Sequence, residues 1–286
     1  MQRDFKQLVP RLPDLLCIGA QKAGTSWFHE TFGLRSDIWI PHYKEMHFFD
    51  YKFVDNNRGW IGPHRMNNLN AARRRHGQNH SVPDPHYLAY LDAIEAGDMD
   101  TLDWYRYVFS PAGADQIALD VTPEYSCIPQ SGVEYVAEVL PNAKFVYIIR
   151  DPLDRAISQL RMNVSRRLRN KPDANINWKN ESQNGVLLNR GNYREYVPRW
   201  ESVFGRDRLL FVPFGKIKSD PVGLFRQVEQ LMGLEPTEYK MVDRVVHKTQ
   251  PLDVPDHAID HLREALAPQY QFLKQHFSAE FVANMK

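Results

Sequence analysis

The sequence predicts an α/β fold in which helices flank a mainly parallel central sheet. Compact apolar runs at 15–18, 116–121 and 144–149 have the composition of buried strands in a parallel sheet. Turn-forming residues and then a helical pattern follow these runs, as expected of strand–helix units. The 286 residues can bury a large core, so we expect a single domain over 1–286.

The first strand, Leu15 to Ile18, runs into a turn of small residues that ends at a helix start. Backbone N–H groups converge at such a junction and the helix dipole adds partial positive charge, so the turn can hold a phosphate. Gly19 and Gly24 have the spacing of the nucleotide-binding loop G-x-x-x-x-G-K-[ST]. Thr25 occupies the lysine position, however, and the lysine is Lys22. A shorter phosphate chain without a bridging metal suits this altered loop; a ligand-free glycine turn is the alternative.

A short second strand, Ile38 to Ile40, stops at Pro41 and continues as HYKEMHFFD, a mixture of titratable and aromatic residues. Glu45 among apolar neighbours would have a raised affinity for protons and could accept the proton of an attacking hydroxyl. His47 is the competing base because its ordinary pKa lies near neutrality. Lys44 would support either base, and a charged surface loop is the remaining interpretation.

Residues 51–113 form a predicted insertion that we expect on the acceptor side of a cleft. Helical patterns occur at 85–96 and 102–109. The basic run Arg73 to His76 could meet an acidic acceptor or nucleic acid, but a solvated charged face is the commoner explanation.

The apolar run at 116–121 contains Asp120 and continues as Thr-Pro-Glu-Tyr. Asp120 could help to hold magnesium, as the acidic residue of such a strand does in a kinase. It could equally be a buried structural carboxylate.

The run at 144–149 delivers Arg150 to the carboxyl end of a strand, where the ligand crevice of such sheets lies. Asp151 can cap the next helix and Pro152 suits its first turn. Arg150 offers a planar fork of donors for a phosphate, and Ser158 lies within the first two helical turns. We therefore expect a second phosphate site beside the first loop; a capped helix with a surface arginine is the alternative.

The remaining elements are expected in chain order. They are helices at 25–34 and 131–140, a polar loop at 170–185, a helix carrying Trp200 and Phe204, a strand at 209–212, a helix from Asp220 through Leu231, and one or two helices over 262–277 interrupted near Pro268. The i, i+4 spacing of Trp200 and Phe204 suits core packing.

Composition excludes several classes of protein. The net charge of +1, from 36 basic and 35 acidic residues, gives no overall field toward nucleic acid or membrane. Cys17 and Cys127 are too few for a disulfide scaffold or a cysteine-rich zinc site, and the histidines are scattered rather than spaced as ligands. No apolar run approaches the roughly 20 residues of a membrane span, and none resembles a signal peptide. We expect a cytoplasmic protein without metal or membrane insertion.

Four segments in the same order carry a family resemblance. They are QKAGTSW at 21–27, KEMHFFD at 44–50, TPEY at 122–125 and RDPLDRAIS at 150–158. They resemble segments of sulfotransferases that use 3′-phosphoadenosine-5′-phosphosulfate (PAPS), in particular heparan sulfate-type and bacterial carbohydrate sulfotransferases. The resemblance implies the sulfotransferase branch of the P-loop fold, with 3′-phosphoadenosine-5′-phosphate (PAP) as product. It also implies that TPEY lines the acceptor pocket.

The resemblance also implies roles for individual residues. The donor would be held by Lys22, Ala23, Gly24, Thr25, Ser26, Trp27, Arg150, Ser158, Tyr193, His247 and Lys248, with Trp27 and Tyr193 beside the adenine and the last two over the 3′-phosphate. Glu45 would be the general base, with Lys22, His47 and Lys44 as the other catalytic residues.

The predicted reaction is in-line transfer of a sulfuryl group to a hydroxyl, or to an amine, of a carbohydrate or small-molecule acceptor. The chain would be a bacterial enzyme or an excised catalytic domain. A P-loop kinase using ATP and magnesium is one alternative, although it leaves the position of Lys22 unexplained. A non-catalytic polyanion-binding protein is the other, and it gives Glu45 no role.

Overall fold

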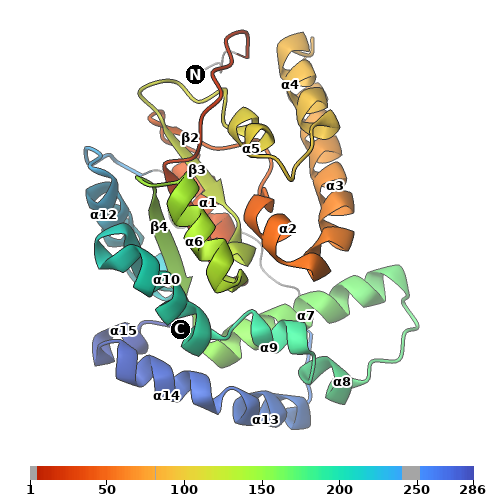
Figure 1. Ribbon diagram of the computed structural model, residues 1–286. Coiled ribbons are helices and arrows are strands. Elements are labelled where there is room, and N and C mark those ends of the chain that lie inside the picture. Colours follow the sequence, from red (N-terminus) through yellow and green to blue (C-terminus); the bar gives the residue numbers. More distant parts are fainter. Residues whose placement is uncertain (1–4, 81, 240–251) are drawn as a thin grey trace. The chain divides into compact units, whose positions relative to one another are not determined.

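The computed structural model describes residues 5–80, 82–239 and 252–286. Its strands are β1 (Leu15–Gly19), β2 (Ile38–Trp39), β3 (Ile117–Val121), β4 (Lys144–Ile149) and β5 (Leu209–Pro213). They form a five-stranded sheet in the order β2-β3-β1-β4-β5 (Figure 1). β1 and β2 both pair with β3 in parallel, with Leu16 opposite Asp120 and Ile38 opposite Ile117. The predicted α/β fold with a mainly parallel sheet is confirmed.

Helices occupy most of the remaining described chain. They are α1 (Thr25–Phe32), α2 (Phe48–Phe53), α3 (Asp55–Asn79), α4 (Pro85–Ala96), α5 (Leu102–Val108), the 3₁₀ turn η1 (Pro123–Cys127), α6 (Gln130–Val139), α7 (Pro152–Asn170), α8 (Trp178–Ser182), α9 (Gly185–Asn189), α10 (Tyr193–Arg208), α11 (Lys216–Ser219), α12 (Pro221–Met232), α13 (Asp256–Ala265), α14 (Ala267–His276) and α15 (Ala279–Ala283). The predicted helices at 85–96, 102–109 and 131–140 and the predicted strand at 144–149 are confirmed to within a residue.

The chain divides into two compact units. The first unit comprises Met1–Ile18 and His29–Phe145, and the second unit comprises Gly19–Phe28 and Val146–Lys286. The expected phosphate loop and the expected base segment therefore belong to different units. The prediction of a single domain with an insertion stays a prediction.

Aromatic packing organises the core of the first unit. Phe48 and Phe49 of α2 are fully buried. The ring of Phe48 stacks on that of Tyr105 of α5, with centroids 4.4 Å apart, and Phe49 meets Tyr125 of η1 edge-on at 5.1 Å. Such pairs add about 0.5–1.5 kcal/mol each beyond the burial of their surface. The two phenylalanines fix α2, the helix that follows residues 44–47, which we call the KEMH turn.

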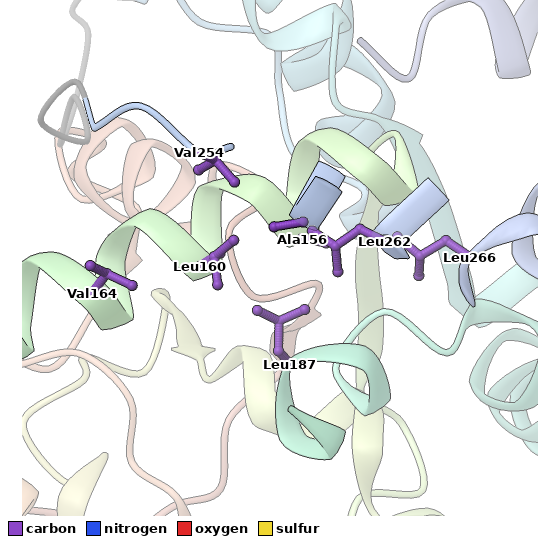
Figure 2. Close-up of a cluster of buried hydrophobic side chains, with 8 residues drawn as sticks. Ala156, Leu160, Val164, Leu187, Val254, Leu262 and Leu266 are labelled. Atoms are coloured by element: carbon purple, nitrogen blue, oxygen red, sulfur yellow. The ribbon is translucent and has the colours of Figure 1, made fainter. Parts of the chain in front are cut away.

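The second unit has an aliphatic core built on α7. Asp151 caps this helix, its carboxylate accepting the N–H groups of Leu153 and Asp154, and Pro152 is the first helical residue, as the sequence predicts. Buried side chains at four-residue spacing, Ala156, Leu160 and Val164, meet Leu187 of α9 and Val254, Ala258, Leu262 and Leu266 from 254–266. Figure 2 shows the α7 stripe with Leu187 beneath it. This packing fixes the helix that carries Ser158.

The helix α3, which has 25 residues, was not predicted from the sequence. Only Ile61, Leu69 and Ala72 of this helix are buried, so it has no apolar stripe from which a helical period could be recognised. Pro63 inside it is a further signal against a helix.

The predicted polar loop at 170–185 is also partly wrong. The structure has two short helices there and just beyond, α8 and α9, each begun by an asparagine side chain: Asn177 accepts the N–H of Asn180, and Asn184 accepts that of Val186. Helices of five residues are too short to show a period, and capping by asparagine is a weak signal without one.

Candidate active site

The turn after β1, residues 19–24 in the second unit, can surround a ligand with backbone groups, and we call it the cradle. The N–H of Ala20 donates to the carbonyl of Ile148 on β4 at 2.9 Å, and the N–H of Ala23 donates to the carbonyl of Ala20 at 3.1 Å. Lys22 and Gly24 both have positive φ, 68° and 82°, which bends the chain sharply before α1 begins. First-turn N–H groups of a helix have no partner within the helix. The local geometry therefore suits an anion at the start of α1.

Gly24 is required for packing as well as for its backbone angle. A Cβ atom there would lie 2.3 Å from Cδ1 of Ile217 and 3.3 Å from the ring of Phe214. The small residues of this turn were expected to let it hold a phosphate. At Gly24 the space is needed by the β5–α11 segment instead.

Arg150 connects the end of β4 to the cradle. Its Nη1 donates to the carbonyl oxygen of Lys22 at 2.7 Å, and its guanidinium lies 4.4 Å from the ring centre of Phe214. Burial lowers the pKa of Arg150 from its ordinary value, yet an arginine remains charged. Among the described residues, the buried Nε has no hydrogen-bond partner. The expected proximity of Arg150 to the first loop is confirmed; its binding of a 3′-phosphate stays a prediction.

Residues 190–193, which read RGNY, contact both the turn after β1 and Arg150. Nη1 of Arg190 donates to the side-chain oxygen of Gln21 in the cradle at 2.8 Å, and the hydroxyl of Tyr193 accepts the N–H of Arg150 at 3.2 Å. Gly191 leaves room for the buried guanidinium of Arg155, since a Cβ atom would lie 2.5 Å from its Nε. Sequence reasoning assigned no role to Gln21 or Arg190, and only the tertiary contact reveals one.

The two predicted adenine contacts are both buried. Trp27 is 4% exposed and stacks on Phe225 of α12 with centroids 4.9 Å apart. Tyr193 is fully buried, and burial raises its pKa to about 12. Their contact with adenine stays a prediction. Phe225, which covers the indole ring of Trp27, is a neighbour that sequence reasoning missed.

The other predicted donor residues have less specific surroundings. Nζ of Lys22 lies 3.8 Å from the sulfur of Met162 on α7. Ser158 is half-buried on the same helix. Lys22 and Ser158 belong to the second unit, as Arg150 does. His247 and Lys248 lie outside the described residues.

The KEMHFFD segment forms a charged cluster in the first unit. Oε1 of Glu45 is 3.1 Å from Nζ of Lys44, and Oε2 is 3.6 Å from Nε2 of His47. His47 is 1% exposed and its Nδ1 lies 2.9 Å from Oδ2 of the fully buried Asp50, which also accepts the side-chain N–H of Asn57 at 3.1 Å. The carboxylate of Glu45 is thus placed between two cations, with 22% of its side chain exposed.

His64 of α3 completes this cluster, and sequence reasoning missed it. Its Nε2 lies 3.6 Å from Oε2 of Glu45, and its ring centre is 5.2 Å from that of His47. Of the residues that the structure describes, Glu45, His47 and His64 form a group whose possible metal-ligand atoms all lie within 4.8 Å of one another. The expectation that the histidines are scattered is therefore wrong at this site. No sequence signal joined His64 to the segment, because α3 itself went unrecognised.

Charge, rather than burial, determines the protonation of Glu45. Burial favours the neutral acid, but the positive charges of Lys44, His47 and His64 outweigh it and hold the pKa of Glu45 well below its usual value. The expected raised proton affinity is wrong, since the apolar residues Met46, Phe48 and Phe49 point into the core while cations surround the carboxylate. Burial opposes charge on His47, but the carboxylates of Asp50 and Glu45 raise its pKa to about 10.

Asp120 stabilises the KEMHFFD segment through the hydroxyl groups of Thr122 and Tyr125. Its carboxylate accepts the hydroxyls of Tyr105 at 2.7 Å, Thr122 at 2.7 Å and Tyr125 at 3.0 Å. Because each hydroxyl has a single proton, those of Thr122 and Tyr125 are left to accept, and they receive the N–H groups of Met46 at 2.9 Å and Phe48 at 3.1 Å.

Each of these two hydrogen bonds holds the N–H group that directly follows a strained residue. Glu45 and His47 have φ of 68° and 55°, a region that residues with a Cβ rarely adopt. The Asp120 network holds the segment in this conformation. Burial raises the pKa of Asp120 to about 6, against the three hydroxyls that lower it. Its interpretation as a buried structural carboxylate is confirmed.

The arginine run is part of the structure of α3. Arg73 forms ion pairs of 2.6 Å with Asp92 and Glu95 of α4, and Arg75 donates to the carbonyl of His42 at 2.9 Å. These contacts agree with a charged helix face. They leave little reason to interpret the run as a polyanion site.

Comparison with known proteins now gives the family. Residues 13–238 match the sulfotransferase family, and the chain belongs to that family. Heparan sulfate glucosamine 3-O-sulfotransferase 3B1 of Mus musculus is 26% identical over 139 residues, which are 47% of this chain and 35% of that protein. Sulfotransferase 1C2 of Oryctolagus cuniculus is 30% identical over 108 residues, 38% of this chain and 36% of that protein. The match thus spans about a third of the length of these relatives.

Solved structures agree with the fold. The sulfotransferase from Alicyclobacillus acidocaldarius superposes with a TM-score of 0.63 at 18% identity, over 96% of this chain and 100% of that one. The sulfotransferase domain from the curacin biosynthetic pathway gives 0.52 at 12% identity, over 97% of each chain. These structures share the α/β architecture. In the described parts of the chain, no helix combines the length and apolar character that crossing a bilayer requires.

Proposed function

We propose that this sulfotransferase-family chain transfers a sulfuryl group from PAPS to a hydroxyl or amine of a carbohydrate or small-molecule acceptor. The observation that carries the proposal is the hydrogen bond between Arg150 and the carbonyl of Lys22 at 2.7 Å. It joins the lysine-bearing turn to an arginine at the end of the neighbouring strand. A donor with phosphates at both its 5′ and 3′ positions requires two such anion sites.

The donor would be bound mainly by the second unit. Lys22 and the N–H groups of Ala23 to Ser26 would hold the 5′-phosphosulfate, and Arg150 with Ser158 would hold the 3′-phosphate. His247 and Lys248 are proposed to cover the 3′-phosphate by resemblance alone. The leaving group gains negative charge on its bridging oxygen, and a preorganised cation at that oxygen contributes roughly 3 to 4 kcal/mol to transition-state stabilisation.

Glu45 is the favoured general base. The acceptor oxygen would attack sulfur as the bond from sulfur to the bridging oxygen breaks, and the acceptor proton would pass to Glu45, leaving PAP. With a pKa near 10, His47 is protonated at neutral pH and has no lone pair free to accept that proton. Glu45 is ionised, with Lys44 and His47 beside it. His47 and Lys44 would then orient the base.

The kinase alternative is less well supported. A kinase of this fold class needs an acidic residue for magnesium, whereas the Asp120 carboxylate accepts three buried hydroxyls. Lys22 is also misplaced for a γ-phosphate. The proposed transfer requires no metal, so full activity in the presence of a chelator is expected. A carbohydrate acceptor is proposed because the matched relatives include heparan sulfate sulfotransferases; nucleic acid is not expected to bind.

Ligand-induced stabilisation tests the donor assignment. We expect PAP with chelator to raise the melting temperature, and ATP with magnesium to leave it unchanged. A ligand at about 100 times its dissociation constant stabilises by about 2.7 kcal/mol, or roughly 4 to 5 °C for a chain of this size. A shift with ATP and magnesium alone would instead support a kinase, and no shift with either ligand would leave a polyanion-binding protein or an inactive relative.

A further inference from the structure

Glu45, His47 and His64 have the chemistry and spacing of a three-ligand metal site. Oε2 of Glu45 lies 3.6 Å from Nε2 of each histidine. Two ligand atoms bound to one tetrahedral Zn²⁺ at about 2.0–2.1 Å lie about 3.4 Å apart, so each oxygen–nitrogen pair needs to contract by only about 0.2 Å. The possible ligand atoms of the three residues all lie within 4.8 Å of one another, so both histidine side chains would also turn toward the ion. We propose that these three side chains bind a divalent transition metal, with Zn²⁺ as the best match to two imidazoles and one carboxylate.

His47 already has the surroundings of a zinc-bound histidine. It is 1% exposed, and its Nδ1 is directed to the buried carboxylate of Asp50 at 2.9 Å. Metal-binding histidines almost always donate their second ring nitrogen to such a carboxylate or to a carbonyl, which fixes the ring and its tautomer. Its Nε2 is buried without a hydrogen-bond partner among the described residues, and a bound metal would displace the proton that this nitrogen carries at neutral pH, releasing it to solvent. This nitrogen is directed toward the oxygen of Glu45.

His64 brings the second imidazole from α3. Its Nε2 also lies 2.9 Å from Nδ2 of Asn68; if that amide donates, the nitrogen presents a lone pair, and a metal would take the place of the amide. Trp60 packs edge-on against both rings, with centroids 4.8 Å from His47 and 5.7 Å from His64. The side chain of His64 is 34% exposed, so an ion can reach the site from solvent.

Glu45 can bind a metal without losing its existing partner. Lys44 lies 3.1 Å from Oε1, whereas both histidines face Oε2. Three protein ligands leave a fourth position open to water or to an acceptor group. If Glu45 is the base of the proposed transfer, Zn²⁺ on Oε2 would inhibit the reaction. That consequence rests on the proposed function, while metal binding itself does not.

Competition with a chromogenic chelator would measure Zn²⁺ binding directly, in the full chain and without substrates. We expect one ion per chain at micromolar or tighter affinity. His64→Gln should weaken binding by about 100-fold or more, and Asp50→Asn, which removes the partner of His47, by about 10- to 100-fold. The control is His86→Gln, which removes an exposed imidazole of α4 and should leave affinity unchanged.

Cobalt substitution provides a readout that does not depend on activity. Co²⁺ bound by two imidazoles and a carboxylate should give a visible d–d absorption band that is lost in His64→Gln and retained in His86→Gln. Circular dichroism would verify that each variant is folded. Absence of Zn²⁺ binding at micromolar concentration, or equal affinity in the wild type and His64→Gln, would overturn the site. Either result would leave the PAP test of the proposed function unaffected.

Discussion

The two units build their candidate sites from different materials. The cradle in the second unit consists largely of backbone: the turn from Gly19 to Gly24, the start of α1, and the carbonyl of Lys22 that Arg150 holds. The cluster in the first unit consists of side chains from β3, η1, α2 and α3 with the KEMH turn. A backbone site is fixed by local sequence, whereas a side-chain cluster depends on residues far away in the chain. Substitutions should therefore have local consequences in one unit and distributed consequences in the other.

Lys22→Ala should have the largest effect. The substitution would remove the cation that is proposed to lie beside the breaking bond and would leave the backbone cradle in place, so kcat should fall by about two to three orders of magnitude. Steady-state kinetics with PAPS would measure it, and Lys218→Ala, on an exposed position of α11, is the matched control. Near-normal turnover in Lys22→Ala would show that the cradle works through its backbone alone.

Arg150→Ala should rank second. A hydrogen bond to a charged group contributes about 1.5–3 kcal/mol, so the affinity for PAP should fall by roughly 10- to 150-fold. Arg150→Lys should be intermediate, because lysine keeps the charge and loses the planar fork. Calorimetric titration with PAP would measure both, with the exposed Arg194→Ala as control. Unchanged affinity in Arg150→Ala would remove the second anion site from the proposal.

Tyr125→Phe tests the distributed character of the first unit. It leaves the buried N–H of Phe48 without its acceptor and Asp120 without one donor, which should destabilise the fold by about 1–3 kcal/mol. Urea unfolding would measure the loss, with Tyr107→Phe in the neighbouring α5 as control. We also expect a lower kcat with unchanged affinity for PAP. Equal loss of PAP affinity would contradict the separation of the two sites.

The smallest expected effect is a pH dependence of stability from Asp120. A carboxyl whose pKa is raised to about 6 from an ordinary 3.8 stabilises the folded state fully below 3.8 and loses that contribution as pH rises through 6. Between pH 7.5 and pH 5 the wild type should therefore gain about 1 kcal/mol relative to Asp120→Asn. Urea unfolding at both pH values would measure the difference, and a constant difference would show that Asp120 does not titrate in this range.

Local signals explain why much of the fold was predictable. The strands at 15–18 and 144–149 and the capped start of α7 at Asp151 were recognisable because burial and helix capping act on neighbouring residues. The helix α3 was not, because its polar surface hides the helical period and only three of its side chains are buried. The short helices α8 and α9 were also not predicted, because five residues are too few to show a helical period.

The candidate site residues also divide into those set by local sequence and those set by tertiary contacts. The sequence by itself determined the cradle, the arginine at the end of β4 and the identity of Glu45 and His47, because each follows from residues adjacent in the chain. Only the tertiary structure decided the charge environment of Glu45, the contact with His64 and the support from Asp120. Electrostatic interactions and hydrogen bonds depend on distance in space. The hydroxyl groups that hold the N–H groups of Met46 and Phe48 come from residues 76 and 77 positions away in the sequence.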